Sequence, residues 1–327
     1  MPDKRLTLAH GNGGRLTREL IETIFAPAFN NPDLDTQSDA ARFLLTGASM
    51  MTTDCYTVDP LFFPGGDIGK LAVCGTVNDL SVSGAVPRYM SVNFLLEEGL
   101  EFSVLESVVT SMAEEARSNA VSIITGDTKV LPKGMVEGMY IVTTGIGSQI
   151  CADISISNIC SGDNIFVSGS VGDHGAAVFL ARAKYGLQGS LQSDCASISV
   201  LAAQLMGIPG LKFMRDPTRG GLATVCHEII RSCKLGVRLV ESVIPLKPEV
   251  QAYCDILGLN PYYLASEGRI VFVVDDQVSI DDICGISDDI HCIGKIEEGH
   301  GNLVLQTDIG GTRIIPELDS DPLPRIC

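Results

Sequence analysis

The strongest constraint on the fold is that strand patterns and helix patterns alternate along both halves of the chain. In the first half, a capping box at Ser103 and Glu106 opens a predicted helix, and the apolar runs 121–125 and 139–146 predict strands. The first of these strands is expected to end at the turn Gly126-Asp-Thr-Lys129.

The second half repeats the alternation after a polar, glycine-containing break near 150–163. Its expected elements are a strand at 164–168, a glycine-rich loop at 169–175, helices at 176–185 and around 222–230, and a strand at 270–274. We therefore predict an α/β (α+β) fold of two domains, 1–155 and 156–315, joined around residue 155.

The last twelve residues, 316–327, hold three prolines and three acids and show no periodicity. Proline disfavours helix and sheet, so we expect an exposed, flexible tail that ends at Cys327. At about 3.3 Å per residue, such a tail reaches roughly 40 Å and can enter a distant cleft on its own subunit or on a neighbour's.

Charge and cysteine usage exclude several classes of protein. The net charge of −17, without a Lys/Arg block, argues against nucleic acid or an anionic membrane as a partner, and no apolar run is long enough to span a membrane. The first residues lack the apolar segment of a signal peptide. The eleven cysteines contain no C-x-x-C pair, which argues against zinc-ribbon and thioredoxin sites. We expect a cytoplasmic protein with reduced, mostly buried thiols.

Four acids stand where strand ends or loops expose them: Asp54, Asp79, Asp127 and Asp216. On a helix, Asp79 has Gly75 and Ser83 one turn to either side, so its carboxylate stands over a flat surface that a ligand can approach. Carboxylates that converge beside phosphate oxygens are typical of a Mg²⁺ site. The alternative is that each acid only caps a helix or forms a turn.

Glycine-rich loops supply candidate phosphate sites. The run His10-Gly-Asn-Gly-Gly14 precedes a helical segment, and Arg215-Asp-Pro-Thr-Arg219 leads into the helix near residue 222, with Arg219 as a fork-shaped donor. The run Gly65-Gly-Asp-Ile-Gly-Lys70 lacks the spacing and the Ser/Thr of a P-loop. Neither a Rossmann glycine pattern after a strand nor a G-x-S-x-G motif occurs.

Two further residues are candidates for catalysis. Lys129 lies two residues after Asp127. If Asp127 lies at a phosphate site, the positive charge of Lys129 suits phosphoryl transfer. Glu267 immediately precedes an apolar strand and is either a desolvated base or a turn residue. The five histidines show no metal-ligand spacing; His174 is either a loop base or a structural residue.

Taken together, the motifs resemble the HypE family of nickel–iron hydrogenase maturation proteins, over essentially the whole chain. The motifs that carry the resemblance are His10-Gly-Asn-Gly-Gly14, Thr53-Asp-Cys-Tyr56, Asp59-Pro-Leu-Phe-Phe-Pro-Gly-Gly66, Gly75-Thr-Val-Asn-Asp79, Val82-Ser-Gly84, Gly126-Asp-Thr-Lys-Val130, Asp173-His-Gly175, Asp216-Pro-Thr-Arg-Gly-Gly221 and the terminal Pro324-Arg-Ile-Cys327. Asp67 stands where relatives carry a different polar residue, so it is not assigned to metal. The wider superfamily includes aminoimidazole-ribonucleotide synthetase, selenophosphate synthetase and thiamine-monophosphate kinase.

The resemblance implies an aminoimidazole-ribonucleotide-synthetase-like fold that dimerises through its N-terminal sheets, with ATP bound near the interface. It implies that HypF carbamoylates the tail cysteine, that ATP-dependent dehydration makes an S-cyanate, and that cyanide passes to iron on HypC–HypD. The implied catalytic residues are Cys327, Glu267 and Lys129. The implied ATP-binding residues are Gly11, Asn12, Gly13, Gly14, Asn78, Asp127, Thr128 and Arg219. The implied Mg²⁺ ligands are Asp54, Asp79, Asp127 and Asp216.

Two alternatives remain at this point. One is a same-fold small-molecule kinase or selenophosphate synthetase, which gives no role to Cys327 and lacks an obvious selenium-handling Cys/Lys pair near the glycine loop. The other is a non-catalytic carrier or scaffold whose tail shuttles a group. Only an enzyme acting on its tail hydrolyses ATP in proportion to tail conversion.

Overall fold

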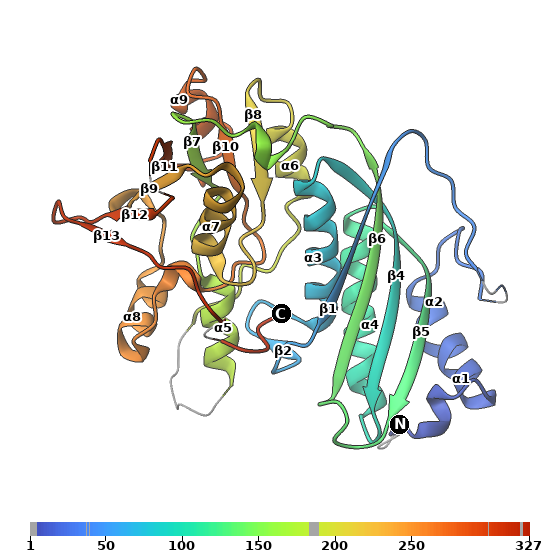
Figure 1. Ribbon diagram of the computed structural model, residues 1–327. Helices are drawn as coiled ribbons and strands as arrows, with labels where there is room; N and C mark the ends of the chain where they lie inside the picture. The colour runs from blue at the N-terminus through green and yellow to red at the C-terminus, as the bar shows by residue number, and fades with distance from the viewer. Residues whose placement is uncertain (1–4, 37, 39, 183–189, 300, 321–322) are drawn as a thin grey trace.

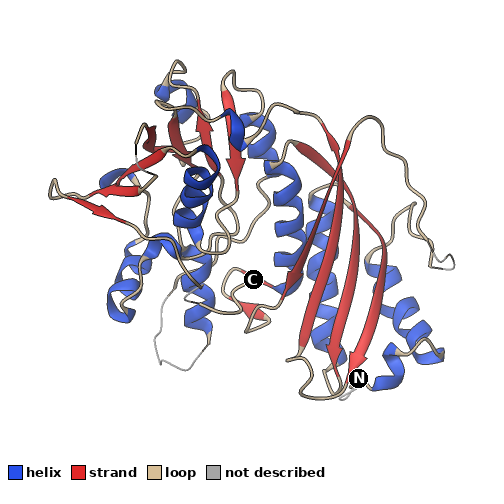
Figure 2. Cartoon of the chain, in the orientation of Figure 1, coloured by secondary structure: helices blue, strands red, loops and turns tan. Residues whose placement is uncertain are grey.

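The computed structural model describes residues 5–36, 38, 40–182, 190–299, 301–320 and 323–327. Its N-terminal unit is a four-stranded sheet in the order β1-β6-β4-β5 (Figures 1 and 2). The strands are β1 (Ser49–Tyr56), β4 (Ala85–Glu97), β5 (Ser122–Leu131) and β6 (Met139–Gln149). β4 and β5 pair in parallel, and the other two pairs are antiparallel. The strand order places β1 and β5 at opposite edges of the sheet.

Helices α3 (Ile68–Val82) and α4 (Phe102–Ser118) pack against each other and cover one face of this sheet (Figure 1). Asp67 caps α3, because its carboxylate accepts hydrogen bonds from the amides of Gly69 and Lys70 at 2.7 and 3.1 Å. The hairpin β2 (Phe62–Phe63) and β3 (Gly66–Asp67) precedes α3. The side chains of β1 that point away from the helices are exposed, and Met51 among them is 71% exposed.

The N-terminal segment lies along the β5 edge. It comprises η1 (Leu8–Gly11), α1 (Arg15–Leu20), the π-helical turn η2 (Ile21–Phe25) and α2 (Ala26–Ala28). Gly11 sits so close to β5 that a Cβ there would stand 2.1 Å from the amide nitrogen of Val130. A larger residue at position 11 would therefore push the glycine loop off the strand.

The C-terminal unit is a seven-stranded, mostly antiparallel sheet in the order β13-β12-β9-β11-β7-β10-β8. The strands are β7 (Asn164–Val167), β8 (Leu211–Arg215), β9 (Gly236–Val240), β10 (Val271–Val274), β11 (His291–Glu297), β12 (Leu303–Gln306) and β13 (Thr312–Ile314). The helices are α5 (Asp173–Ala181), α6 (Ser199–Leu205), α7 (Gly221–Cys233), α8 (Pro248–Leu257) and α9 (Ile280–Cys284), with the short turns η3 (Ile156–Asn158), η4 (Glu241–Val243) and η5 (Pro261–Tyr263).

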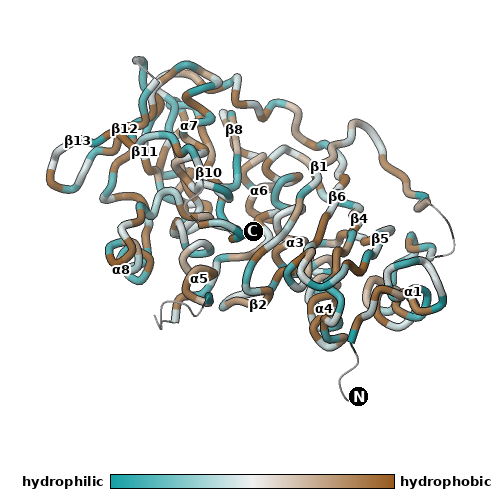
Figure 3. Tube along the Cα trace, turned by 60° about the horizontal axis from the view of Figure 1, so that its bottom comes forward, coloured by the Kyte–Doolittle hydropathy of each residue, from teal (hydrophilic) through white to brown (hydrophobic). Residues whose placement is uncertain are grey.

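The hydrophobic core joins the two units. One cluster packs α3, α4 and the N-terminal sheet together with α5, α8 and the end of the tail. Two smaller clusters fill the space between the C-terminal sheet and α7, and between its other face and α6 and α9. Two views place the C-terminus between the units, close to β1 and β2 (Figures 1 and 3). Among the described residues, no helix has the length and apolar character needed to cross a bilayer.

The structure corrects several predicted boundaries. The helix predicted to open at a Ser103–Glu106 capping box begins at Phe102, with Glu101 as its N-cap. The strand predicted to stop before Gly126 continues to Leu131, because β4 pairs with it along that length. Helix α5 begins at Asp173 rather than at 176, and residues 183–185 of the predicted helix lie outside the described part of the chain.

The thiols differ from the expectation of mostly buried cysteines. Cys74, Cys195, Cys226 and Cys254 are buried, Cys55 and Cys160 are exposed, and the others are partly exposed. No disulfide links any of the eleven, all of which lie in described segments.

Candidate active site

A pocket of about 50 Å³ lies where β1, α3, the segment after β8 and the segment before β10 meet the end of the chain. We call it the tail pocket. Its lining residues are Asp54, Cys55, Tyr56, Gly75, Asp79, Asp216, Thr218, Arg219, Glu267 and Cys327. Residues separated by most of the chain length therefore line one small pocket.

Three carboxylates bring negative charge into the tail pocket. Burial and the neighbouring Asp79 raise the pKa of Asp54 to about 6, while Arg219 opposes the shift. Burial, with Asp79 as the next cause, raises the pKa of Asp216 to about 7. Asp79 is oriented by Thr52, whose hydroxyl donates to Oδ2 at 2.7 Å. The raised pKa values of Asp54 and Asp216 show that burial and mutual repulsion disfavour their ionised forms. A bound cation would stabilise those ionised forms.

Glu267 is a buried acid of the pocket, and one of its carboxyl oxygens is unpaired within the described part of the chain. It is 2% exposed, and its Oε1 has no hydrogen-bond partner among the described residues. Burial raises the pKa of Glu267 well above its usual range, and the surrounding acidic side chains and Cys195 add to the shift. A raised pKa makes the carboxylate form of Glu267 a stronger base than an exposed glutamate.

The tail is docked, which corrects the expectation of an exposed end. Leu323 and Ile326 are 5% and 4% exposed and belong to the main core cluster. The composition predicted an irregular chain, but it could not show that α5 and α8 supply an apolar wall for Leu323.

Fixed donors hold the carbonyl groups of the tail. Arg182 donates to the carbonyls of Pro324 and Arg325 at 2.6 and 2.5 Å. The Nε2 of the buried His174 lies 2.8 Å from the carbonyl of Ile326, to which it donates. The amide and hydroxyl of Thr57 both donate to a backbone oxygen of Cys327 at 3.2 Å. The backbone of the tail is therefore anchored as far as its last residue.

Arg219 reaches the reactive end of the tail. Its Nε lies 3.3 Å from the Cys327 sulfur, and its Nη2 donates to the carbonyl of Cys55 at 3.4 Å. The pKa of Arg219 is raised, first by the hydrogen bond to Cys327. In this structure the predicted anion-binding arginine contacts the tail thiol.

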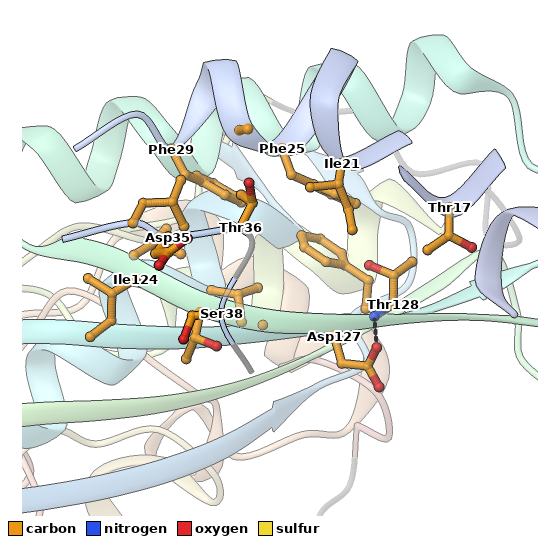
Figure 4. Close-up of a pocket in the computed structure, with 17 residues that line it drawn as sticks. Thr17, Ile21, Phe25, Phe29, Asp35, Thr36, Ser38, Ile124, Asp127 and Thr128 are labelled. Carbon is orange, nitrogen blue, oxygen red and sulfur yellow. Dashed lines mark hydrogen bonds between the residues drawn. The ribbon is translucent and has the colours of Figure 1, made fainter. Parts of the chain in front are cut away.

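Asp127, Thr128 and the glycine loop lie elsewhere, because β5 is the opposite edge strand from β1. Asp127 and Thr128 line a cavity of about 170 Å³, which we call the Thr128 cavity. Figure 4 shows Phe25 and Phe29 on one side of β5 and Asp127 on the other. Lys129 follows on the same strand and is exposed. The predicted four-aspartate cluster is thus split: within one chain, Asp127 does not join Asp54, Asp79 and Asp216.

Asn78 does not face a ligand space. It is 1% exposed, its Nδ2 group donates to the carbonyls of Ala196 and Glu267 at 3.1 Å each, and its Oδ1 accepts from the amide of Ile198 at 2.9 Å. The prediction that Asn78 binds ATP is therefore wrong for this structure, since its polar atoms are already used.

Two family models match the chain: the N-terminal domain of AIR synthase related proteins over residues 37–149 and the corresponding C-terminal domain over residues 161–306. Carbamoyl dehydratase HypE of Escherichia coli (strain K12) is 43% identical over 335 residues, covering 98% of this chain and 99% of its own length. HypE of Rhodobacter capsulatus is 41% identical over 336 residues, covering 99% of both chains. The chain belongs to the HypE family of carbamoyl dehydratases.

Solved HypE structures share the fold. A HypE crystal structure in complex with ATP has a TM-score of 0.93 and 42% identity, covering 98% of this chain and all of the other. HypE in a HypE–HypF complex has a TM-score of 0.79 and 41% identity, covering 91% and 99%. The predicted HypE resemblance and the two-domain fold are confirmed.

Three residues around this pocket were not among the functional candidates predicted from the sequence: Tyr56, Arg182 and Asp194. Tyr56 stands over α3, where a Cβ on Gly75 would lie 2.4 Å from its hydroxyl. The motif Asp173-His-Gly175 signalled His174, but not its contact with the tail. Arg182 and Asp194 carried no local signal, because their partners are distant in sequence.

No group of three His, Cys, Asp or Glu side chains within the described segments is already arranged to coordinate one ion. The donor chemistry of the tail pocket nevertheless fits Mg²⁺, which prefers carboxylate oxygens. Asp54, Asp79 and Asp216 are the residues of one chain that would hold it.

Proposed function

We propose that this chain uses ATP to dehydrate a carboxamide on the sulfur of its own Cys327, which yields an S-cyanate that supplies the cyanide ligands of nickel–iron hydrogenase. The observation that supports this most strongly is that Cys327 docks in the same small pocket as Glu267, whose carboxyl oxygen Oε1 has no partner among the described residues. The tail enters the pocket of its own subunit, so we infer that it reacts in cis.

The residues of the tail pocket suit this chemistry. An amide oxygen is a poor leaving group; ATP supplies the phosphoryl group that turns it into phosphate, and Mg²⁺ neutralises the phosphate charge when bound. Arg219 holds the thiol end. One N–H proton of the carboxamide is lost to solvent when its oxygen is phosphorylated, and Glu267 takes the other as the carbon–oxygen bond breaks. The carbon stays on sulfur, the oxygen leaves with phosphate, and the balance is loss of one water from the tail.

We infer that ATP is held by the Thr128 cavity, with Asp127, Thr128, Lys129 and the loop Gly11–Gly14 around its phosphates. In one chain this cavity lies at the β5 edge, across the sheet from the tail pocket at the β1 edge. A homodimer formed through the N-terminal sheets would bring the β5 edge of one subunit to the β1 edge of the other. This arrangement accounts for the split of the four aspartates.

We propose a HypF-type carbamoyltransferase as the donor and a HypC–HypD complex as the cyanide acceptor. Support for the donor comes from the solved HypE–HypF complex of a relative. A thiol that must accept a carbamoyl group has to stay reduced, which is consistent with the cytoplasm.

Formation of ADP separates this proposal from the alternatives. The carbamoylated chain should form one ADP per tail, whereas the unmodified chain and Cys327→Ser should form almost none. A scaffold would bind ATP without such turnover, and a small-molecule kinase would hydrolyse ATP regardless of Cys327. ADP formation that does not depend on carbamoylation would overturn the proposal.

A further inference from the structure

Glu267 is held firmly at its backbone. Its carbonyl accepts from the Nδ2 of Asn78 at 3.1 Å and from the amide of Ala196 at 3.4 Å. Its amide donates to the Oδ1 of Asp194 at 3.1 Å, and the amide of Gly268 donates to the other oxygen of Asp194 at 3.3 Å. Both polar groups of the Glu267 peptide backbone are thus fixed by side chains or loops from elsewhere in the chain.

The holding residues are themselves immobilised. The carbonyl of Ala196 and the amide of Ile198 occupy the remaining groups of Asn78. The Asp194 side chain is 1% exposed and lies 3.4 Å from the Nε of Arg269. A Cβ at Gly268 would stand 2.0 Å from the carbonyl oxygen of Asp194, so the two segments are in close contact. Little space is left for Glu267 to shift.

The carboxyl end of Glu267 differs from its backbone, because Oε1 has no hydrogen-bond partner in the described part of the chain. No other feature of the pocket places this oxygen by direct hydrogen bonding. The backbone restraint therefore fixes the point from which the Glu267 side chain extends into the pocket that it shares with Cys327.

We propose that Asn78 and Asp194 are positioning residues that hold Glu267 against the tail, an inference that rests on the proposed dehydration. Asn78 comes from α3 of the N-terminal unit, Asp194 from the segment before α6, and Glu267 from the segment before β10. The restraint therefore crosses between the two units. It also explains why Asn78 precedes Asp79: adjacent helical residues diverge by about 100°, so one faces the Glu267 segment and the other the carboxylate pocket.

A double-mutant cycle tests this inference. Full-length protein is carbamoylated by its donor partner, mixed with ATP and Mg²⁺ under single-turnover conditions, and the loss of water from the tail is timed by mass spectrometry. Asn78→Ala should slow dehydration by about 100-fold, the scale expected for a misplaced catalytic group, while ATP affinity changes by less than about twofold. In a Glu267→Gln background, the same substitution should slow the residual reaction by less than about twofold, because its target is already lost.

Controls keep the test decisive. Asp194→Asn is nearly isosteric and should show the same pattern, so it carries the cycle if Asn78→Ala fails to fold by circular dichroism. Ser168→Ala removes another buried hydrogen bond, the one that the hydroxyl accepts from the amide of Ile270 at 2.8 Å, without touching Glu267. It should change the rate by less than about threefold.

The inference is overturned if the effects of the Asn78 and Glu267 substitutions multiply, or if Ser168→Ala slows the reaction as much as Asn78→Ala. Failure of the wild-type tail to lose water would instead overturn the proposed function itself. The two failures are therefore distinguishable.

Discussion

The tail pocket and the Thr128 cavity are built in opposite ways. The tail pocket is small, lined in part by acidic side chains, and contains Cys327. The Thr128 cavity is larger, has aromatic side chains from the N-terminal helical segment on one wall, and lies beside a glycine loop. One chain thus carries features suited to the chemical step at one sheet edge and features suited to a nucleotide at the other. Within one chain the two sets of features do not meet, and the proposed dimer would bring them together.

The largest effect should come from Glu267→Gln in the tail pocket. The swap keeps the shape but removes the proton acceptor, so dehydration should slow by about 10³-fold, within the range for loss of a general base. ATP affinity, which we propose depends on the Thr128 cavity, should stay within about twofold. Single-turnover mass spectrometry and nucleotide titration measure the two quantities. An equal loss of dehydration rate and of ATP affinity would show that the tail pocket and the Thr128 cavity do not have separate functions.

A mixture of two inactive variants tests whether each site is built from two subunits. Asp127→Asn damages the nucleotide half and Glu267→Gln the chemical half. If each site combines the β5 edge of one subunit with the β1 edge of the other, half of the randomly mixed dimers contain one intact site. Activity should then recover to roughly a quarter of the wild-type value. Sites confined to one chain would give no recovery.

Protonation of His174 should weaken folding at acidic pH. Burial lowers the pKa of His174 from 6.5 to about 4, so the unfolded chain binds this proton more tightly than the folded one. Its contribution to stability is therefore present above pH 6.5 and is lost as pH falls towards 4. Relative to His174→Gln, the wild type should lose about 2 kcal/mol of unfolding free energy between pH 7 and pH 5.

Denaturant titrations of both proteins at the two pH values measure this difference. The raised pKa values of Asp54, Asp194 and Asp216 make the folded state more stable as pH falls, which opposes the effect of His174. Both proteins share this contribution, so it cancels in the difference between wild type and variant. A constant gap between the two proteins would show that His174 is not buried as a neutral residue against the tail.

The smallest effect is expected from Cys327→Ala on stability. Cys327 is only partly buried, so the unfolding free energy should change by less than about 1 kcal/mol. Deletion of residues 323–327 exposes the apolar surfaces that Leu323 and Ile326 cover, and should cost about 3 kcal/mol. Thermal and denaturant unfolding distinguish the two variants. Equal stability of the truncated and full-length chains would mean that the tail does not dock in solution.

Sequence patterns predicted much of this fold because β7 and β10 are short, mostly apolar runs, β6 begins with one, and α7 has a clear helical period. The pattern missed the continuation of β5 through Gly126 and Asp127, since parallel pairing with β4, not local propensity, keeps those residues extended.

For the site, motifs predicted Asp54, Asp79, Asp216, Arg219, Glu267 and Cys327, which line one pocket. They failed for Asn78, whose partners Ala196 and Glu267 lie 118 and 189 residues away. A single sequence does not distinguish an asparagine that binds a nucleotide from one that binds a distant backbone group. They also failed for the tail, whose docking depends on side chains from α5 and α8. Long-range contacts of this kind leave no periodic signal in a single sequence.

Mass spectrometry of the C-terminal peptide tests the central claim most directly. The full-length chain is incubated with its carbamoyl donor and then with ATP and Mg²⁺, and the peptide that contains Cys327 is followed through both steps. The account predicts that Cys327 alone gains one carbamoyl group and then loses one water only when ATP is added. A modification on another cysteine, or a carbamoylated Cys327 that keeps its water in the presence of ATP, would contradict it.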